Sequence, residues 1–278
     1  MTTPLDGLRR LLARSFHRWP RPRVATTLLA AVHFLTRVPT PATWPVTADD
    51  IGRSQALFPL VGLLLGAMLV ALDAGLSALL ARPIVDGLLL LVAIAVTGAL
   101  HLDGFVDSCD GLFSFTSPER RLEIMRDSHV GAFGAVGACL LLLVKWAALV
   151  AVPAPLKPAA LLLMPTLARW SIVYNYAMYP YARPEPGLSR TIKEHAVPSR
   201  LALATGIAVA ASVAVLGPPG LLLTVGAWTL VVALAAYVLR KLPGLTGDTY
   251  GFVAELVEVL VLLGVPLVQG GYRAGGVA

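Results

Sequence analysis

The chain has 278 residues, of which 57% are hydrophobic and only 14% are charged. Soluble domains carry about 25% charged residues, so this composition excludes an ordinary soluble protein and favours a membrane protein. The formal net charge is +6, and an excess of basic residues in a membrane protein first indicates its topology; we expect no nucleic-acid partner. The two cysteines, Cys109 and Cys139, form neither a CxxC pair nor a Cys/His spacing, which argues against a zinc site or a disulfide framework.

The N-terminal residues 1–23 hold six arginines and predict a basic cytoplasmic extension without a clear signal peptide. The apolar segment 24–38 is short, and His33 and Arg37 interrupt it. It predicts an interfacial or re-entrant helix, with a full span as the alternative. Three prolines between residues 39 and 45 then end this helix.

Apolar runs long enough to cross about 30 Å of hydrocarbon recur along the rest of the chain. They predict an all-α, polytopic helical membrane protein with about seven transmembrane helices, since a helix satisfies its own backbone groups in lipid. The expected spans cover residues 55–80, 83–102, 131–152, 158–180, 201–217, 220–239 and 252–269. We expect one integral membrane catalytic domain over 24–270 and a short tail over 271–278.

The basic residues predict the orientation. With a cytoplasmic N-terminus, seventeen of the 22 Lys and Arg residues fall in the inner segments 1–54, 103–130, 181–200 and 240–251. Only three fall in the outer segments, Arg82, Lys157 and Arg273, and the remaining two, Lys145 and Arg169, lie within spans. This bias predicts a multi-pass protein of the bacterial cytoplasmic (inner) membrane whose acid-rich loops, and therefore its active site, face the cytoplasm. The sequence leaves open whether the protein is a monomer or a homo-oligomer.

Three aspartates follow one of the expected spans. Asp103, Asp107 and Asp110 stand at i, i+4 and i+7, which places them on one face of a helix. Beside a bilayer this cluster is costly unless a cation neutralises it or it serves the chemistry. Three carboxylates without His or Cys suit Mg²⁺ or Mn²⁺, so we predict a metal site; a solvated loop with chance spacing is the alternative. Gly104 and Gly111 would let another backbone or a phosphate approach closely.

A second cluster follows at residues 120–134. Asp127 is predicted to be a further metal ligand, since it stands four residues after Glu123. Arg120 and Arg126 are predicted to hold phosphate oxygens, which a guanidinium fork suits. The alternative is a surface helix stabilised by ion pairs between neighbouring turns.

A third cluster leads into the last expected span. Glu255 and Glu258 lie within that span and are costly there unless they face the bundle interior. Asp248 stands seven residues before Glu255 and would share its face. Metal binding by Glu255 and ion pairing of the glutamates with Lys145 or Arg169 remain open alternatives.

Together the clusters predict a metal site at the cytoplasmic membrane face, and phosphoryl transfer is the reaction class that most often needs one. The pattern Asp107-x-x-Asp110-Gly111 resembles the opening of the CDP-alcohol phosphotransferase signature, but the later half is missing. A lipid synthase of that class is therefore an alternative. A secondary transporter is a weaker one, because it would be expected to carry acids near the midplane and repeated halves.

A closer resemblance is to the adenosylcobinamide-GDP ribazoletransferase (cobalamin synthase) family, over roughly residues 25–265. The segments that resemble it, in order, are 33–39, 58–62, 101–111, 123–128 and 246–249. The chain departs from the family pattern at His129 and at Phe105-Val106, and neither change removes a carboxylate.

The resemblance implies that a hydroxyl of α-ribazole, or of its 5′-phosphate, attacks adenosylcobinamide-GDP and displaces GMP, giving adenosylcobalamin or its 5′-phosphate. Mg²⁺ (or Mn²⁺) would neutralise the diphosphate, and a carboxylate would accept the hydroxyl proton. Spacing does not fix which aspartate is the base. The residues expected to bind metal are Asp103, Asp107, Asp110, Asp127 and, more weakly, Glu255. Those expected to take part in catalysis are His101, Asp107, Asp110 and Asp127. Those expected to bind the cofactor or the substrate phosphates are Arg120, Arg126, Gly104 and Gly111, and Asp248 is expected to bind the cofactor as a further, weaker candidate for the metal.

Overall fold

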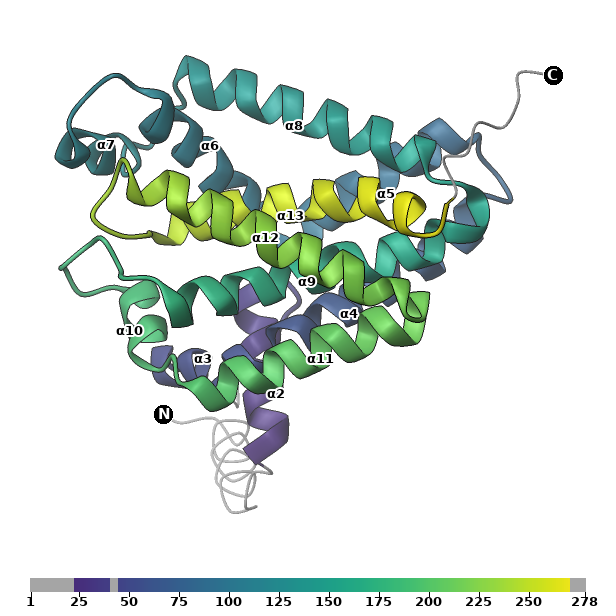
Figure 1. Ribbon diagram of the computed structural model, residues 1–278, viewed down its shortest axis with the longest axis horizontal. Coiled ribbons are helices and arrows are strands. Elements are labelled where there is room, and N and C mark those ends of the chain that lie inside the picture. The colour runs from purple at the N-terminus through teal and green to yellow at the C-terminus, as the bar shows by residue number, and fades with distance from the viewer. Residues whose placement is uncertain (1–22, 41–44, 271–278) are drawn as a thin grey trace, which may run out of the picture.

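The computed structural model describes residues 23–40 and 45–270. The predicted basic extension, apart from Arg23, and the predicted tail 271–278 lie outside the described residues. Figure 1 shows a bundle of long helices, and within the described ranges the only β-type pairing is the single bridge between Tyr181 and Leu245. The all-α prediction is confirmed.

The helices run in chain order and are labelled in Figure 1. Their bounds are α2 Arg23–Leu35, α3 Ala48–Ser54, α4 Phe58–Leu76, α5 Arg82–Thr97, α6 Leu100–Phe113, α7 Pro118–Ile124, α8 Ala132–Ala151, α9 Lys157–Met178, α10 Leu188–Glu194, α11 Pro198–Leu216, α12 Pro219–Leu239 and α13 Gly247–Val268. Short 3₁₀ turns, η1 Gln55–Leu57 and η2 Ala154–Leu156, precede α4 and α9.

Several of these helices are suited to a bilayer. Among the described residues, five helical segments are long and apolar enough to cross one: residues 48–76, α8, α11, α12 and α13. The bent pair α5–α6 would be a sixth. The protein is therefore a polytopic helical membrane protein. Helix α9 is also 22 residues long, but it carries polar groups such as Arg169 and Asn175 and lies at the centre, packed against α4, α11 and α13.

The expected span 83–102 is not continuous, which corrects the sequence prediction. The chain breaks at Gly98 (φ 63°) and Ala99 (φ 58°), both left-handed, and α6 leaves α5 at an angle of 91°. Glycine takes this conformation at no steric cost, whereas Ala99 is strained in it. The Arg37 backbone N–H donates to the Val96 carbonyl at 2.7 Å, so the segment after α2 supplies a hydrogen-bond donor to a carbonyl near the end of α5. As a result α6 starts inside the bundle.

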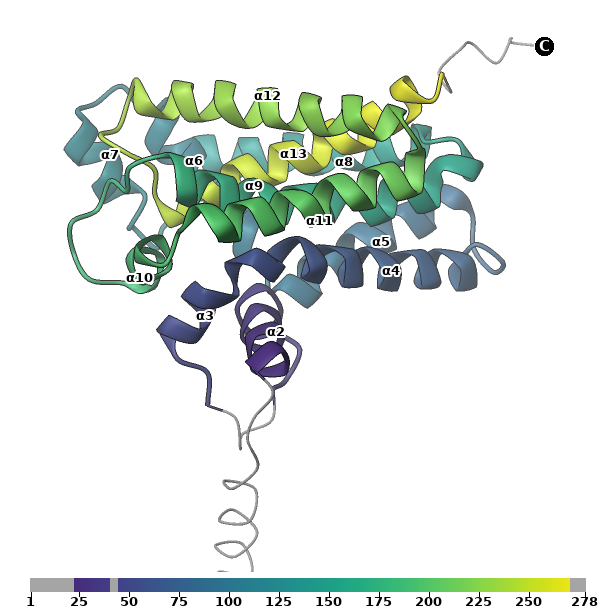
Figure 2. The ribbon, with the colours of Figure 1, turned by 60° about the horizontal axis from the view of Figure 1, so that its bottom comes forward.

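Helix α2 has 13 residues, too few to cross a bilayer. It lies steeply across the other helices in both views and packs on α3 and α4 (Figures 1 and 2). This geometry agrees with the predicted interfacial or re-entrant helix and argues against a full span.

The connections fall into two groups. Those that contain α7 and α10, and the loop between α12 and α13, gather at one end of the bundle together with α3 (Figure 1). These are the segments predicted to share one side of the membrane. The opposite end holds an ion cluster, called here the far-end cluster. Lys157 donates to both carboxylate oxygens of Asp86 at 2.5 Å, and Arg82 pairs with Asp73 at 2.8 Å and with Asp86 at 2.9 Å.

Candidate active site

A polar cleft of about 190 Å³ opens where α6, α9, α10 and α13 meet, and the end of α2 contributes to its wall. Its acidic side is formed by Asp103 and Asp248, and its other walls include Tyr176, Tyr250 and His101. The Tyr176 and Tyr250 rings pack with centroids 4.2 Å apart. The cleft lies at the same end of the bundle as the loops that contain α7 and α10.

Two glycines bring the walls of the cleft together. A Cβ on Gly104 would lie 2.8 Å from the Asp248 carbonyl, and one on Gly251 would lie 2.7 Å from the His101 carbonyl. Helices α6 and α13 can therefore approach closely only because both residues lack side chains. A capping box formed by Thr246 and Thr249 starts α13 and presents Asp248 in its first turn, where an acid is favourable. The group that approaches Gly104 is thus a protein backbone.

The aspartate stripe descends from the surface into the protein. Asp103 is exposed, Asp107 is half-buried and Asp110 is buried. The charges of Asp103, Asp110 and Asp248 all act on Asp107. The guanidinium that faces this group is that of Arg183, which donates to Asp248 at 2.7 Å. Acidic groups are therefore in excess here.

The carboxylates here do not form a complete metal site by themselves. Among residues 23–40 and 45–270, no group of three acidic, His or Cys side chains could hold a metal ion. Mg²⁺ is usually bound by one or two carboxylates with substrate oxygens and water completing its shell, so an open arrangement of carboxylates fits it. The metal role of the stripe stays a prediction.

Asp110 has a second task that its position in the stripe does not reveal. Its two carboxylate oxygens accept the backbone N–H groups of Gly131 and Gly134, each at 2.8 Å. Asp110 thereby caps the start of α8, where a negative charge is stabilising. A Cβ on either glycine would lie 2.4 Å from this carboxylate. In the sequence, the spacing Gly-x-x-Gly at the start of an apolar run is the feature that could have indicated this contact.

Asp127 lies apart from the stripe. It accepts hydrogen bonds from the His129 backbone N–H at 3.0 Å and from the His129 ring at 2.6 Å. These bonds hold the pKa of the exposed Asp127 carboxyl below its usual value. Neither residue lines the cleft. The structure does not bring this predicted ligand together with Asp103 and Asp107.

The predicted phosphate-binding arginines lie on the surface. Arg120 pairs with Glu123 at 2.7 Å within α7, which is the ion-pair alternative. Arg126 pairs with Glu185 at 2.6 Å and so joins two loops at this end. Gly111 is covered by Met125, whose Cγ would lie 2.6 Å from an added Cβ, so the contact there is packing. A role for these three residues in binding phosphate stays a prediction.

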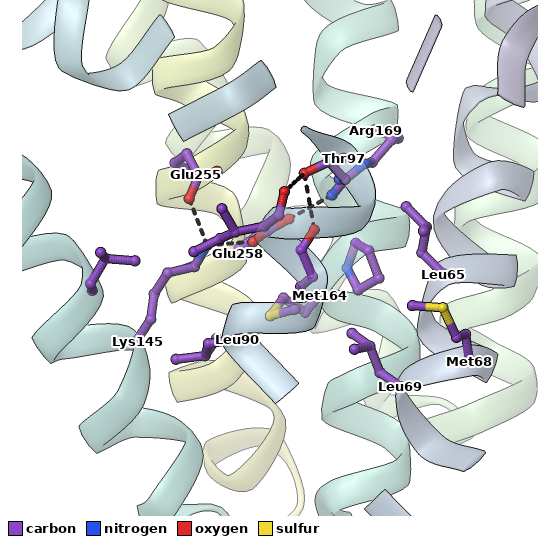
Figure 3. A pocket seen from close by; sticks show the side chains of 14 residues that line it. Leu65, Met68, Leu69, Leu90, Thr97, Lys145, Met164, Arg169, Glu255 and Glu258 are labelled. Atoms are coloured by element: carbon purple, nitrogen blue, oxygen red, sulfur yellow. Dashed lines mark hydrogen bonds and ion pairs between the residues drawn. The ribbon is translucent and has the colours of Figure 1, made fainter. Parts of the chain in front are cut away.

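The glutamates of α13 belong to a buried ion network, which comprises Lys145, Arg169, Glu255 and Glu258 (Figure 3). Lys145 donates to Glu255 at 2.6 Å and also to Glu258, and Arg169 donates to Glu258 at 2.5 Å. All four side chains are at least nine-tenths buried. Glu255 therefore faces a lysine instead of the aspartate stripe, and the arrangement corrects its assignment as a metal ligand in favour of the ion-pair alternative.

Proteins described as adenosylcobinamide-GDP ribazoletransferase are similar over most of their length. The one from Desulfitobacterium hafniense is 43% identical, covering 85% of this chain and 95% of that protein. Those from Geotalea daltonii and Stutzerimonas stutzeri are 40% and 41% identical over 86% and 87% of this chain, and over 96% and 98% of their own. No solved structure matches. The family model described as cobalamin-5-phosphate synthase matches residues 27–266, and the chain belongs to that family.

Proposed function

We propose that this protein joins adenosylcobinamide-GDP to α-ribazole or α-ribazole 5′-phosphate and releases GMP. Membership of the family supports the reaction. The observation that carries the site is the cleft lined by Asp103 of α6 and Asp248 of α13, whose charges also act on Asp107, one turn after Asp103. A diphosphate can enter such a cleft only with a cation, which is why we include Mg²⁺, or Mn²⁺, in the proposal.

Within this proposal the aspartates have two roles, metal binding and proton acceptance. Asp103, Asp107 and Asp248 would hold Mg²⁺ with the substrate oxygens, and the ion would neutralise the charge that develops on the departing GMP. Asp103 and Asp107 are the candidate proton acceptors for the attacking hydroxyl. Among the described residues, neither carboxylate accepts a hydrogen bond or forms an ion pair, whereas both oxygens of Asp110 accept N–H groups and Asp127 lies in an exposed turn.

We place the cleft on the cytoplasmic side of the inner membrane. The support is the grouping of the basic inner segments at the cleft end of the bundle. Reporters fused within 110–125 and 185–195 should read cytoplasmic, and a reporter at the C-terminus should read periplasmic. A cytoplasmic C-terminus would mean that the number of spans is even.

The reaction is tested with purified protein in detergent or liposomes. We expect GMP release from adenosylcobinamide-GDP that requires both α-ribazole and Mg²⁺, with the joined product seen by mass spectrometry. A CDP-linked lipid with an alcohol acceptor is the matched control, since the lipid-synthase alternative predicts CMP release from it. GMP release that ignores the ribazole, or CMP release alone, would overturn the proposal.

A further inference from the structure

His101 lies between the buried ion network and the cleft. It is the second residue of α6, is 4% exposed and contributes to the cleft wall. Its Nδ1 lies 3.4 Å from Nη2 of Arg169, whose Nη1 binds Glu258. The network thus ends on a side chain of the candidate active site.

The network itself is hard to explain by stability alone. It contains two acids and two bases, and its charges balance. Replacing a buried ion pair by well-packed apolar residues is often neutral or stabilising. Ionisable groups within a membrane bundle are therefore expected to serve a function.

We propose that this network, acting through Arg169, holds His101 as a fixed N–H donor for an oxygen of the bound substrate. The inference rests on the proposed function, and it assigns His101 a role other than that of a base. Arg169 is the positioning residue, and a phosphate or ribose oxygen is the acceptor.

The hydrogen-bonding groups of Arg169 determine which ring nitrogen of His101 carries the proton. Arg169 carries only N–H donors and no acceptor. A guanidinium N–H faces a ring nitrogen favourably only where that nitrogen presents a lone pair, so Nδ1 of His101 is the acceptor. A neutral imidazole carries a single N–H, which then resides on Nε2.

Nε2 of His101 is a buried atom that forms no hydrogen bond with any described residue. A buried N–H left unpaired is unfavourable, so a group from outside the chain is expected to satisfy it. The carboxylates that line the cleft, Asp103 and Asp248, are acceptors only. The N–H at Nε2 would therefore join the hydroxyl groups of the lining, such as that of Tyr250, as a donor for a phosphate or sugar oxygen.

The position of His101 is also fixed by contacts of its backbone and by the ion network. The His101 backbone is pressed against Gly251, where an added Cβ would lie 2.7 Å from the His101 carbonyl. Lys145 and Arg169 grip Glu258 from two other helices, α8 and α9. A donor fixed from two sides needs little reorganisation when substrate binds.

Three substitutions at His101 test its role. The amide nitrogen of His101→Gln takes the place of Nε2 and keeps a donor there, whereas His101→Asn reaches only to Nδ1 and His101→Ala removes both. We expect the Gln variant to keep at least about a tenth of the wild-type rate of GMP release, and the Asn and Ala variants to lose about 10²–10³-fold. A base would instead make all three equally inactive. Gln no better than Ala, with an active wild type, would overturn the inference; an inactive wild type would overturn the proposed function instead.

The proton itself is observed by ¹⁵N NMR on histidine-labelled protein, with His101→Asn identifying the resonances of His101. The wild type should show the proton on Nε2. Arg169→Met, which cannot donate, should release the tautomer and lower GMP release as far as His101→Ala does, and Arg169→Lys should restore both. A wild-type proton on Nδ1, or a tautomer that ignores Arg169→Met, would overturn the inference. If Arg169→Met fails to fold, the wild-type spectrum and the Gln/Asn comparison still decide.

Discussion

The two ends of the bundle carry charge in opposite ways. In the far-end cluster two acids meet two bases, and every member is paired with another member. At the cleft end Asp103, Asp107, Asp110 and Asp248 gather around a single ion pair, the one between Arg183 and Asp248. Balanced charges tie helices together; an unbalanced set of acids needs a cation from outside. Charge balance therefore distinguishes the far-end cluster from the candidate site.

The largest effect on activity is expected at the unbalanced end. Asp107→Asn keeps the shape of the side chain and removes its charge, so GMP release should fall by about 10³-fold or more. Thermal unfolding should stay as in the wild type, because no neighbour depends on this carboxylate for a hydrogen bond. Near-wild-type activity in Asp107→Asn would remove the aspartate stripe from the chemistry.

The far-end cluster should respond in the opposite way. Asp86→Asn leaves Lys157, which is 3% exposed, without its carboxylate, and breaking a buried pair costs about 3–5 kcal/mol of stability. The midpoint temperature of thermal unfolding should fall, while the rate of GMP release per folded molecule should equal that of the wild type. The double variant Asp86→Leu/Lys157→Met is the control, since it removes both charges and should recover most of the loss. A lower rate per folded molecule would contradict the purely structural role.

Asp110 should combine both effects. Asp110→Asn turns one accepting oxygen into a donor that faces a backbone N–H of α8, at a cost of about 1–3 kcal/mol. We expect GMP release to fall as well, though by less than in Asp107→Asn, since the charge of Asp110 acts on Asp107. Unfolding and GMP release are measured on the same preparation as Asp107→Asn. A variant as stable as Asp107→Asn would show that the cap contributes little.

The smallest expected effect is a shift in pH dependence. Protons and Mg²⁺ compete for the same carboxylates, so activity should fall at low pH, and more Mg²⁺ should move that fall to still lower pH, by about one unit or less per tenfold increase. The measurement is the rate of GMP release against pH at two Mg²⁺ concentrations. Full activity in excess EDTA would show that no metal ion balances the acidic side chains. A loss of activity at low pH that does not depend on the Mg²⁺ concentration would show the same.

The sequence predicted the helices better than it predicted the partners of their side chains. Apolar runs are local, so the segments that became α4, α8, α11, α12 and α13 could be placed from them. The break after α5 could not, because it depends on a left-handed Ala99 and on a hydrogen bond from Arg37, sixty residues earlier.

The candidate site was predictable to the same extent. The i, i+4, i+7 spacing placed three aspartates on one helix, and Asp248 joined them as a residue of the third cluster. The fate of Glu255 remained open because Lys145 is 110 residues away, and the distance along the chain gives no hint that their helices adjoin. Asp127 is near the stripe in sequence, but its carboxylate accepts a hydrogen bond from the His129 backbone N–H within the same turn.

The break between α5 and α6 makes the catalytic region depend on a distant stretch of chain. A straight helix supplies partners for its own carbonyls, but this one needs a donor from residue 37 at Val96. Substitutions or truncations that shift residues 36 and 37 would therefore tilt α6 without touching an acid. The placement of the aspartate stripe on α6 therefore depends on backbone contacts made by residue 37 as well as on the residues of α6 itself.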